Sequence, residues 1–157
     1  MKEIGFGDKP VAIFLITPSF EEVSNIFIKQ LYYVLAKETL LFKTRKCKRA
    51  VIFNLDKFVN IQAIENFVDI ITVSLDIGIR FNIVIQALSE LTNLYKEDDS
   101  TIIKNCECLI YISSKDNNTN YFMEKFLNID LKKLKDNNEI LIISNNNIIY
   151  KEKLKNK

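Results

Sequence analysis

A short apolar run that ends on a carboxylate is the part of this sequence best suited to chemistry. Val51–Leu55 is rich in apolar and β-branched residues, and Asp56 follows it directly. Open α/β sheets bind their ligands at the carboxyl ends of the strands. Asp56 could there hold a Mg²⁺-bound water, as the equivalent carboxylate does in nucleotide-hydrolysing motors. The alternative is an aspartate that caps the following turn, and spacing alone leaves both open.

The residue after this carboxylate argues against hydrolysis. A hydrolytic site of this kind has a second carboxylate there, and this chain has Lys57. A lysine with a pKa near ~10.4 stays protonated at neutral pH and cannot act as a base. The phosphate-loop pattern G-x-x-x-x-G-K-[ST] is absent, and the Gly5-Phe6-Gly7 cluster is expected to be a flexible start instead. The residues therefore predict no enzyme from this chain alone.

Composition excludes several other classes. The net charge of +2 does not indicate any particular class of partner. No apolar run approaches the ~20 residues needed to cross a bilayer. The N-terminus lacks the layout of a secretory signal, so a cytoplasmic location is expected. An odd number of cysteines, no histidine and no CxxC pair make a disulfide framework or a zinc site unexpected. Cys47, Cys106 and Cys108 are predicted to be free thiols.

Apolar periodicity predicts an α/β protein with a largely parallel sheet. Strands are expected at residues 11–16, 51–55, 79–85 and 108–112, the first of them covered on both faces. Helices are expected at residues 23–35, 64–75, 88–95 and 121–127. Ser19 and Glu22 form a capping box for the first helix, and Gly78 is suited to end the second. A hairpin of residues 139–144 and 148–150 closes the chain, and residues 151–157 are expected to be a frayed basic tail.

One further polar residue ends a predicted strand. Gln86 follows the run 79–85 and could sense a γ-phosphate or position a water in a strand–loop–helix site. The alternative is a neighbour of a helix N-cap.

Several segments together resemble the C-terminal half of the VirD4/TraG/TraD coupling proteins of conjugation and type IV secretion. The run 10–18 is similar to a family strand that ends in proline, and 55–61 (LDKFVNI) is similar to its Walker B pattern L-D-E-F-x-N-I-G. Residues 85–95 resemble I-L-Q-x-x-x-Q-L…L-Y, and 102–107 resemble I-x-x-N-C-D. Asp116 and Thr119 fit its D-x-x-T helix start. The family-motif positions are thus Asp56, Asn60, Gln86, Asn105, Asp116 and Thr119.

The resemblance implies a fold and a set of partners. The family's motor domain is a RecA-like, P-loop NTPase-type sheet, mostly parallel and flanked by helices, which uses ATP and Mg²⁺. Its members are membrane-anchored hexamers that deliver relaxosome-bound DNA, and this part is labelled a TraM-recognition region. For residues 1–157 the resemblance implies a single truncated motor domain that lacks the Walker A strand. Partners would be a relaxosome protein or other coupling-protein subunits, with DNA met indirectly at the inner face of the membrane.

The departures from the family pattern surround one site. Lys57 replaces the expected glutamate at the general-base position, Gln62 replaces a glycine, and Leu75 stands where an arginine is common. They predict a chain that needs no cofactor and does not hydrolyse ATP by itself. Asp56 would hold Mg²⁺ only if another polypeptide supplied the phosphate loop. The alternative is a non-enzymatic module that docks a relaxosome protein or an intact coupling-protein hexamer. A sheet that lacks its central strand would expose strand edges, so self-association of the chain is also expected.

Overall fold

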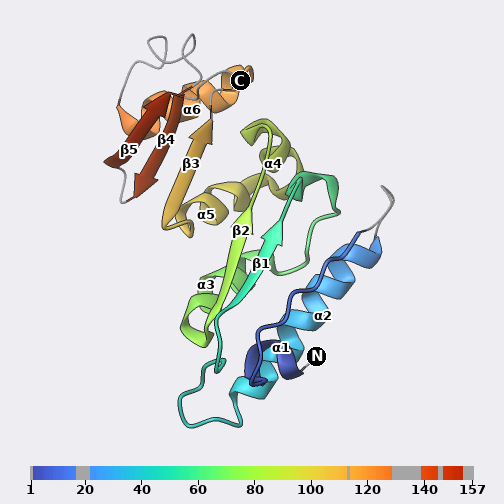
Figure 1. The fold of residues 1–157 in the computed structure, drawn as a ribbon. Coiled ribbons are helices and arrows are strands. Elements are labelled where there is room, and N and C mark those ends of the chain that lie inside the picture. Colours follow the sequence, from blue (N-terminus) through green and yellow to red (C-terminus); the bar gives the residue numbers. More distant parts are fainter. Residues whose placement is uncertain (1, 17–21, 113, 129–138, 145–146, 154–157) are drawn as a thin grey trace. The chain divides into compact units, whose positions relative to one another are not determined.

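The computed structural model describes residues 2–16, 22–112, 114–128, 139–144 and 147–153 (Figure 1). The chain divides into two compact units, residues 1–85 and 86–157. Each unit has its own sheet and its own buried side chains. Ser19, in the predicted capping box, lies outside the described residues. Of the predicted frayed tail 151–157, residues 154–157 also lie outside them, whereas residues 151–153 belong to the last described strand.

The first unit is built on two parallel strands. These are β1 (Val51–Leu55) and β2 (Ile79–Ile83), paired from Val51 opposite Ile79 to Leu55 opposite Ile83. The connection between them contains the 3-10 turn η1 (Phe58–Asn60), α3 (Phe67–Ser74) and the 3-10 turn η2 (Leu75–Ile77). Gly78 ends this connection at φ 80°, so the predicted glycine cap is confirmed. The helices α1 (Lys2–Phe6) and α2 (Glu22–Thr39) precede β1.

One face of this small sheet carries the core. Burial alternates along β1, with Val51, Phe53 and Leu55 inward. The Phe81 ring on β2 stacks on the Phe53 ring with the ring centroids 4.8 Å apart, and its centroid lies 6.3 Å from that of Tyr32 on α2. The opposite face is exposed, and there the Asn82 side-chain amide donates to the Asn54 Oδ1 at 2.8 Å. Among the described residues of the first unit, helices therefore pack on the face that carries Phe53 and Phe81.

The predicted strand at residues 11–16 is wrong. These residues form no helix or strand, and the exposed fractions of Val11, Ile13, Phe14, Leu15 and Ile16 run from 46% to 92%. A strand needs an edge to pair with, and within the described residues β1 pairs with β2 alone. The apolar pattern of residues 11–16 indicated extended backbone, but it carried no information about whether another strand would lie beside them.

The start of the chain also differs from expectation. Gly5 lies inside α1 and is packed against the fold, so the flexible start is wrong. A Cβ at Gly5 would lie 3.1 Å from the Cys47 Sγ and 3.2 to 3.3 Å from the Leu35 and Val51 side chains. Glycine is used here because α1 approaches the core too closely for a larger residue.

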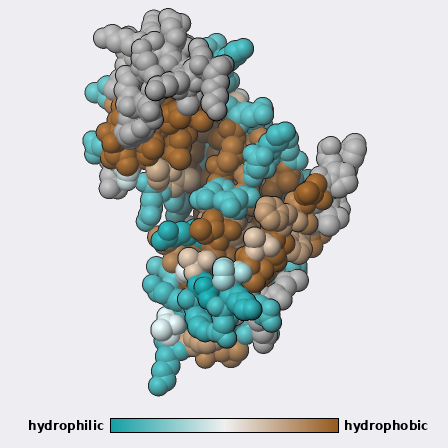
Figure 2. Space-filling view, viewed as in Figure 1, coloured by the Kyte–Doolittle hydropathy of each residue, from teal (hydrophilic) through white to brown (hydrophobic). Residues whose placement is uncertain are grey.

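The second unit combines helices with an antiparallel sheet. Its helices are α4 (Leu88–Tyr95), the 3-10 turn η3 (Lys96–Asp98), α5 (Asp99–Lys104) and α6 (Asn117–Leu127). Its strands are β3 (Cys108–Ile112), β4 (Glu139–Ser144) and β5 (Asn147–Lys153), in the order β3-β4-β5. Tyr111, Met123, Leu141 and Ile143 form the core where α6 covers the sheet. The other face of β3 leaves Ile110 and Ile112 exposed, and Figure 2 shows apolar surface over these strands.

The predicted fold class is correct at the level of mixed α/β and needs correction in its sheet. The described residues form two sheets, one parallel and one antiparallel, instead of one mostly parallel sheet. β3 pairs with the closing hairpin and not with the β1-β2 pair. Its partner is β4, with Cys108 opposite Ser144 and Ile112 opposite Ile140. The predicted C-terminal hairpin is confirmed. Apolar periodicity did not reveal α5, and it placed the start of α6 at residue 121, four residues late. The family's D-x-x-T pattern marks the observed start, because Asp116 is the N-cap of α6.

Candidate functional site

Asp56 and Lys57 form an exposed corner at the carboxyl end of β1. Backbone hydrogen bonds continue past the strand ends, since Val84 N donates to Leu55 O and Phe58 N donates to Val84 O, both at 3.0 Å. Leu55 and Phe58 are buried on either side of the corner. Asp56 and Lys57 are exposed between these two anchors, and Asp56 has no hydrogen-bond or ion-pair partner within the described part of the chain. The carboxylate is therefore presented to solvent at the position that the sequence predicted.

Lys57 adopts a backbone conformation that lysine rarely takes. Its φ is 49° and its ψ is 47°, in the left-handed region. Residues with a Cβ pay roughly 1–2 kcal/mol there. The turn is closed by Asn60 N, which donates to Lys57 O at 2.8 Å. Most residues with a Cβ would meet a similar cost at this position, so the turn and not the lysine side chain imposes the conformation.

This corner alone does not form a metal centre. Mg²⁺ is bound through one or two carboxylates together with waters and substrate phosphates. Asp56 offers one carboxylate, and its neighbour is a cation. In the part of the chain that the structure describes, no group of three His, Cys, Asp or Glu side chains could hold a metal ion. A Mg²⁺ ion on Asp56 with a phosphate loop from another polypeptide stays a prediction.

The remaining positions of the predicted site fall in different places. Asn60 is exposed at the end of η1. Gln86 is exposed and is the first residue of the second unit. Asn105 follows α5, where its side-chain amide donates to Thr101 O at 2.9 Å. Asn60 thus belongs to the first unit, and Gln86 and Asn105 belong to the second.

Asp116 and Thr119 instead form the centre of a polar cluster in the second unit. Asp116 caps α6, because its Oδ2 accepts from Thr119 N at 2.7 Å and from the Thr119 Oγ1 at 2.6 Å. The same Thr119 oxygen accepts from Leu88 N, the first residue of α4, at 2.8 Å. Ser89 Oγ donates to the Asp116 Oδ1 at 3.4 Å. One threonine thus connects the amino ends of two helices, and the hydrogen bonds from Thr119 lower the pKa of Asp116.

A second chain of hydrogen bonds ties this cluster to β3. The Tyr111 hydroxyl donates to the Asn120 Oδ1 at 2.6 Å, and the Asn120 Nδ2 donates to Ser114 O at 3.0 Å. Ser114 Oγ accepts from Asp116 N at 3.1 Å. Burial explains this pairing, because unpaired polar groups in a core are costly. Tyr111 and Asn120 are the residues that the sequence analysis missed. Alternation along β3 puts Tyr111 on the covered face, so a partner for its hydroxyl could have been sought.

The outer face of α6 carries an exposed aromatic residue. The Tyr121 side chain is 63% exposed, and the Lys125 Nζ lies 5.6 Å from the centre of its ring. Asn117 and Asn118 are exposed one turn earlier. The hydrogen bonds of Asp116 and Thr119 fix the start of this helix. The helix therefore presents Tyr121 from a defined position.

Comparison with known families identifies the region that holds both Asp56 and Asp116. Residues 50–127 match the model of a family described as the TraM recognition site of TraD and TraG. The match runs from the start of β1 to the end of α6. It places the chain in the TraG/TraD family of coupling proteins, through the C-terminal region of those proteins. A comparison with curated proteins found no match. Among the described residues, no helix is long and apolar enough to span a bilayer.

Proposed function

We propose that this chain is a coupling-protein segment that docks a relaxosome protein of the TraM type. The observation that carries the proposal is the match of residues 50–127 to a family described by TraM recognition. In this proposal the chain contacts DNA only through the relaxosome protein, and its protein partners recruit it to the inner face of a membrane. Docking on an intact coupling-protein hexamer is the second candidate, because the same match relates the chain to such subunits.

The outer face of α6 is the contact surface that we propose. Tyrosine is enriched among the residues that dominate binding energy, since it offers a large rigid area and one polar tip. Tyr121 is exposed and lies under the Lys125 ammonium. The hydrogen bond from Thr119 N to Asp116 orients the first turn of α6, so little conformational freedom is lost on binding.

Replacement of Tyr121 by alanine should weaken binding of the TraM-type protein. We expect a rise in Kd of about 10- to 100-fold, as for a central interface tyrosine. Biolayer interferometry with the purified relaxosome protein measures this directly. Tyr33→Ala is the matched control, because Tyr33 is also exposed and lies on α2 outside the matched residues. Equal losses for both variants, or no binding by the unmodified chain, would contradict the proposal.

We further propose that the Asp56 corner does not hydrolyse ATP by itself. Lys57 offers no carboxylate base, and Asp56 alone offers a single metal-binding group. The purified chain with ATP and Mg²⁺ should release phosphate at the rate of buffer, and Asp56→Ala should leave that rate unchanged. A malachite-green phosphate assay measures it. Turnover that disappears in Asp56→Ala would show that the corner is catalytic.

A further inference from the structure

The segment after α2 combines exposed aliphatic side chains with unpaired cations. Residues 40–49 read LLFKTRKCKR and contain five cations and no acidic residue. We propose that the apolar-basic turn, residues 40–46 of this segment, binds the surface of an anionic lipid membrane. This inference goes beyond docking of a relaxosome protein, because the contact is made by the chain itself and lies outside the matched residues.

Backbone hydrogen bonds hold the apolar-basic turn in a fixed conformation. Leu41 N donates to Glu38 O at 3.0 Å, Phe42 N donates to Thr39 O at 3.1 Å, and Arg45 N donates to Phe42 O at 3.1 Å. The chain is then fastened to the end of η2, where Cys47 N donates to Ile77 O at 2.8 Å. The apolar-basic turn therefore has a defined backbone conformation, and hydrogen bonds hold it at both ends.

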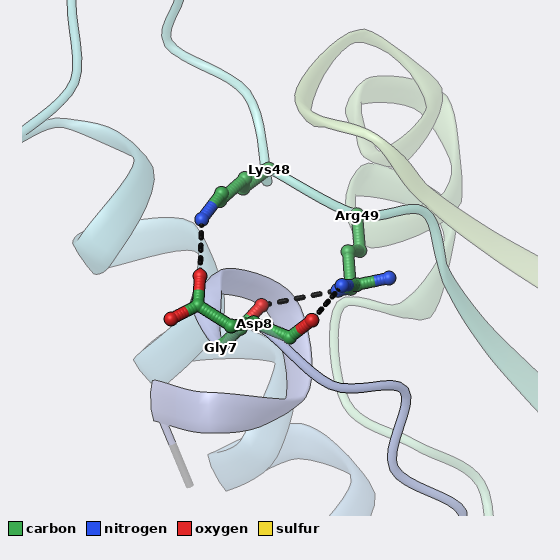
Figure 3. Close-up of polar contacts among 4 residues, drawn as sticks. All are labelled: Gly7, Asp8, Lys48 and Arg49. Carbon is green, nitrogen blue, oxygen red and sulfur yellow. Dashed lines mark hydrogen bonds and ion pairs between the residues drawn. The ribbon is translucent and has the colours of Figure 1, made fainter.

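The cations of the segment have two different roles. Lys48 forms an ion pair with Asp8 at 2.7 Å, and the Arg49 guanidinium donates to the backbone oxygens of Gly7 and Asp8 (Figure 3). These two residues attach the segment to the end of α1. Lys43, Arg45 and Lys46 are exposed and have no ion-pair partner within the described residues. Three positive charges remain for an anionic partner.

The apolar residues beside these charges favour lipid over nucleic acid. Leu41 is 75% exposed and Leu40 is 59% exposed, although burial of such side chains is favourable. Single-stranded nucleic acid is bound through aromatic platforms on which bases stack. The Phe42 ring already stacks on Phe6, with centroids 4.8 Å apart and planes within 8°. Aliphatic tips flanked by cations fit the boundary between headgroups and acyl chains.

Co-sedimentation of the full chain with vesicles tests the proposal. We expect binding to an equal mixture of phosphatidylcholine and phosphatidylglycerol and none to phosphatidylcholine alone. The variant K43E/R45E/K46E should weaken binding at least about 100-fold, because each cation adds severalfold affinity for an anionic surface. The variant L40S/L41S should weaken it about tenfold through lost apolar burial. Added salt should weaken binding of the unmodified chain.

A matched charge control separates this surface from the overall charge. K96E/K104E/K115E makes the same charge change at exposed lysines of the second unit, and it should retain binding. The milder K43Q/R45Q/K46Q serves if the reversed charges impair folding, which a thermal melt checks. Equal losses in the control set, or no effect of L40S/L41S, would overturn the proposal. So would binding to a fluorescent DNA oligonucleotide without binding to vesicles, which would identify a nucleic-acid surface instead.

Discussion

Phe58→Ala should lower the free energy of unfolding of the first unit by about 3–5 kcal/mol, as expected when a fully buried phenylalanine is removed from a core. The Phe58 side chain has no exposed surface. Its ring lies 5.0 Å from Phe67, which meets Phe81 edge-on at 5.5 Å. The loss should appear in chemical denaturation followed by circular dichroism, and in faster hydrogen exchange of the β1 and β2 amides.

Two other variants show whether burial is the cause. Phe42 stacks on Phe6 but is 41% exposed, so Phe42→Ala should cost about 1 kcal/mol or less. Lys57→Gly should stabilise the unit by about 1 kcal/mol, since glycine takes the left-handed conformation without the Cβ penalty. If Phe58→Ala cost no more than Phe42→Ala, the Asp56 corner would not be anchored by Phe58.

Phe58 anchors this corner without help from its polar side chains. Phe58 fixes the turn by burying its ring, whereas Asp56 and Lys57 contribute no buried side chain to the fold. A carboxylate at position 57 could therefore be exchanged for a lysine without loss of packing. The apolar residues therefore set the shape of this corner, and its two exposed polar residues can vary without changing that shape.

Local patterns predicted the parts of the fold that depend on local information. The apolar, β-branched run at 51–55 and the helical spacing in 88–95 identified β1 and α4. The wrong strand at 11–16 and the placement of β3 in the wrong sheet have the same cause. Both depend on which distant strand pairs with the segment, and local periodicity does not indicate that partner. The short helix α5 carries one buried side chain, Ile102, which is too little to give a period.

The same limit applies to the candidate site. Asp56 was found because it ends a strand, and Asp116 with Thr119 because they fit the D-x-x-T helix start of the family that the chain resembles. The bond from Leu88 N to Thr119 Oγ1 joins residues 31 positions apart, so no local motif could reveal it. The Tyr111 hydroxyl and Asn120 pair for the same reason, through a core that forms only in the folded unit.

Thr119→Val should destabilise the second unit by about 1–2 kcal/mol, because it leaves the partly buried Leu88 N–H without its acceptor. Valine keeps the shape of threonine, so the loss reports the hydroxyl alone. Leu88 N would lose its acceptor and Asp116 would lose its shortest hydrogen bond. Thermal and urea denaturation measure the change. Thr92→Val is the control, since the Thr92 hydroxyl donates to Leu88 O and to the Asp99 carboxylate but is exposed, so water can replace both bonds.

The pH dependence of the same variant distinguishes the Thr119–Asp116 bond from packing. The pKa of Asp116 is lowered first by the Thr119 hydroxyl, so its ionised form stabilises the folded unit. That contribution is complete above the unfolded pKa of about 3.9 and is lost as pH falls through the lower folded pKa. Thr119→Val should shrink this loss below about pH 4, and Asp116→Asn should remove it. An unchanged acid profile in both variants would mean that Thr119 acts through packing, and that the start of α6 is not set by its carboxylate cap.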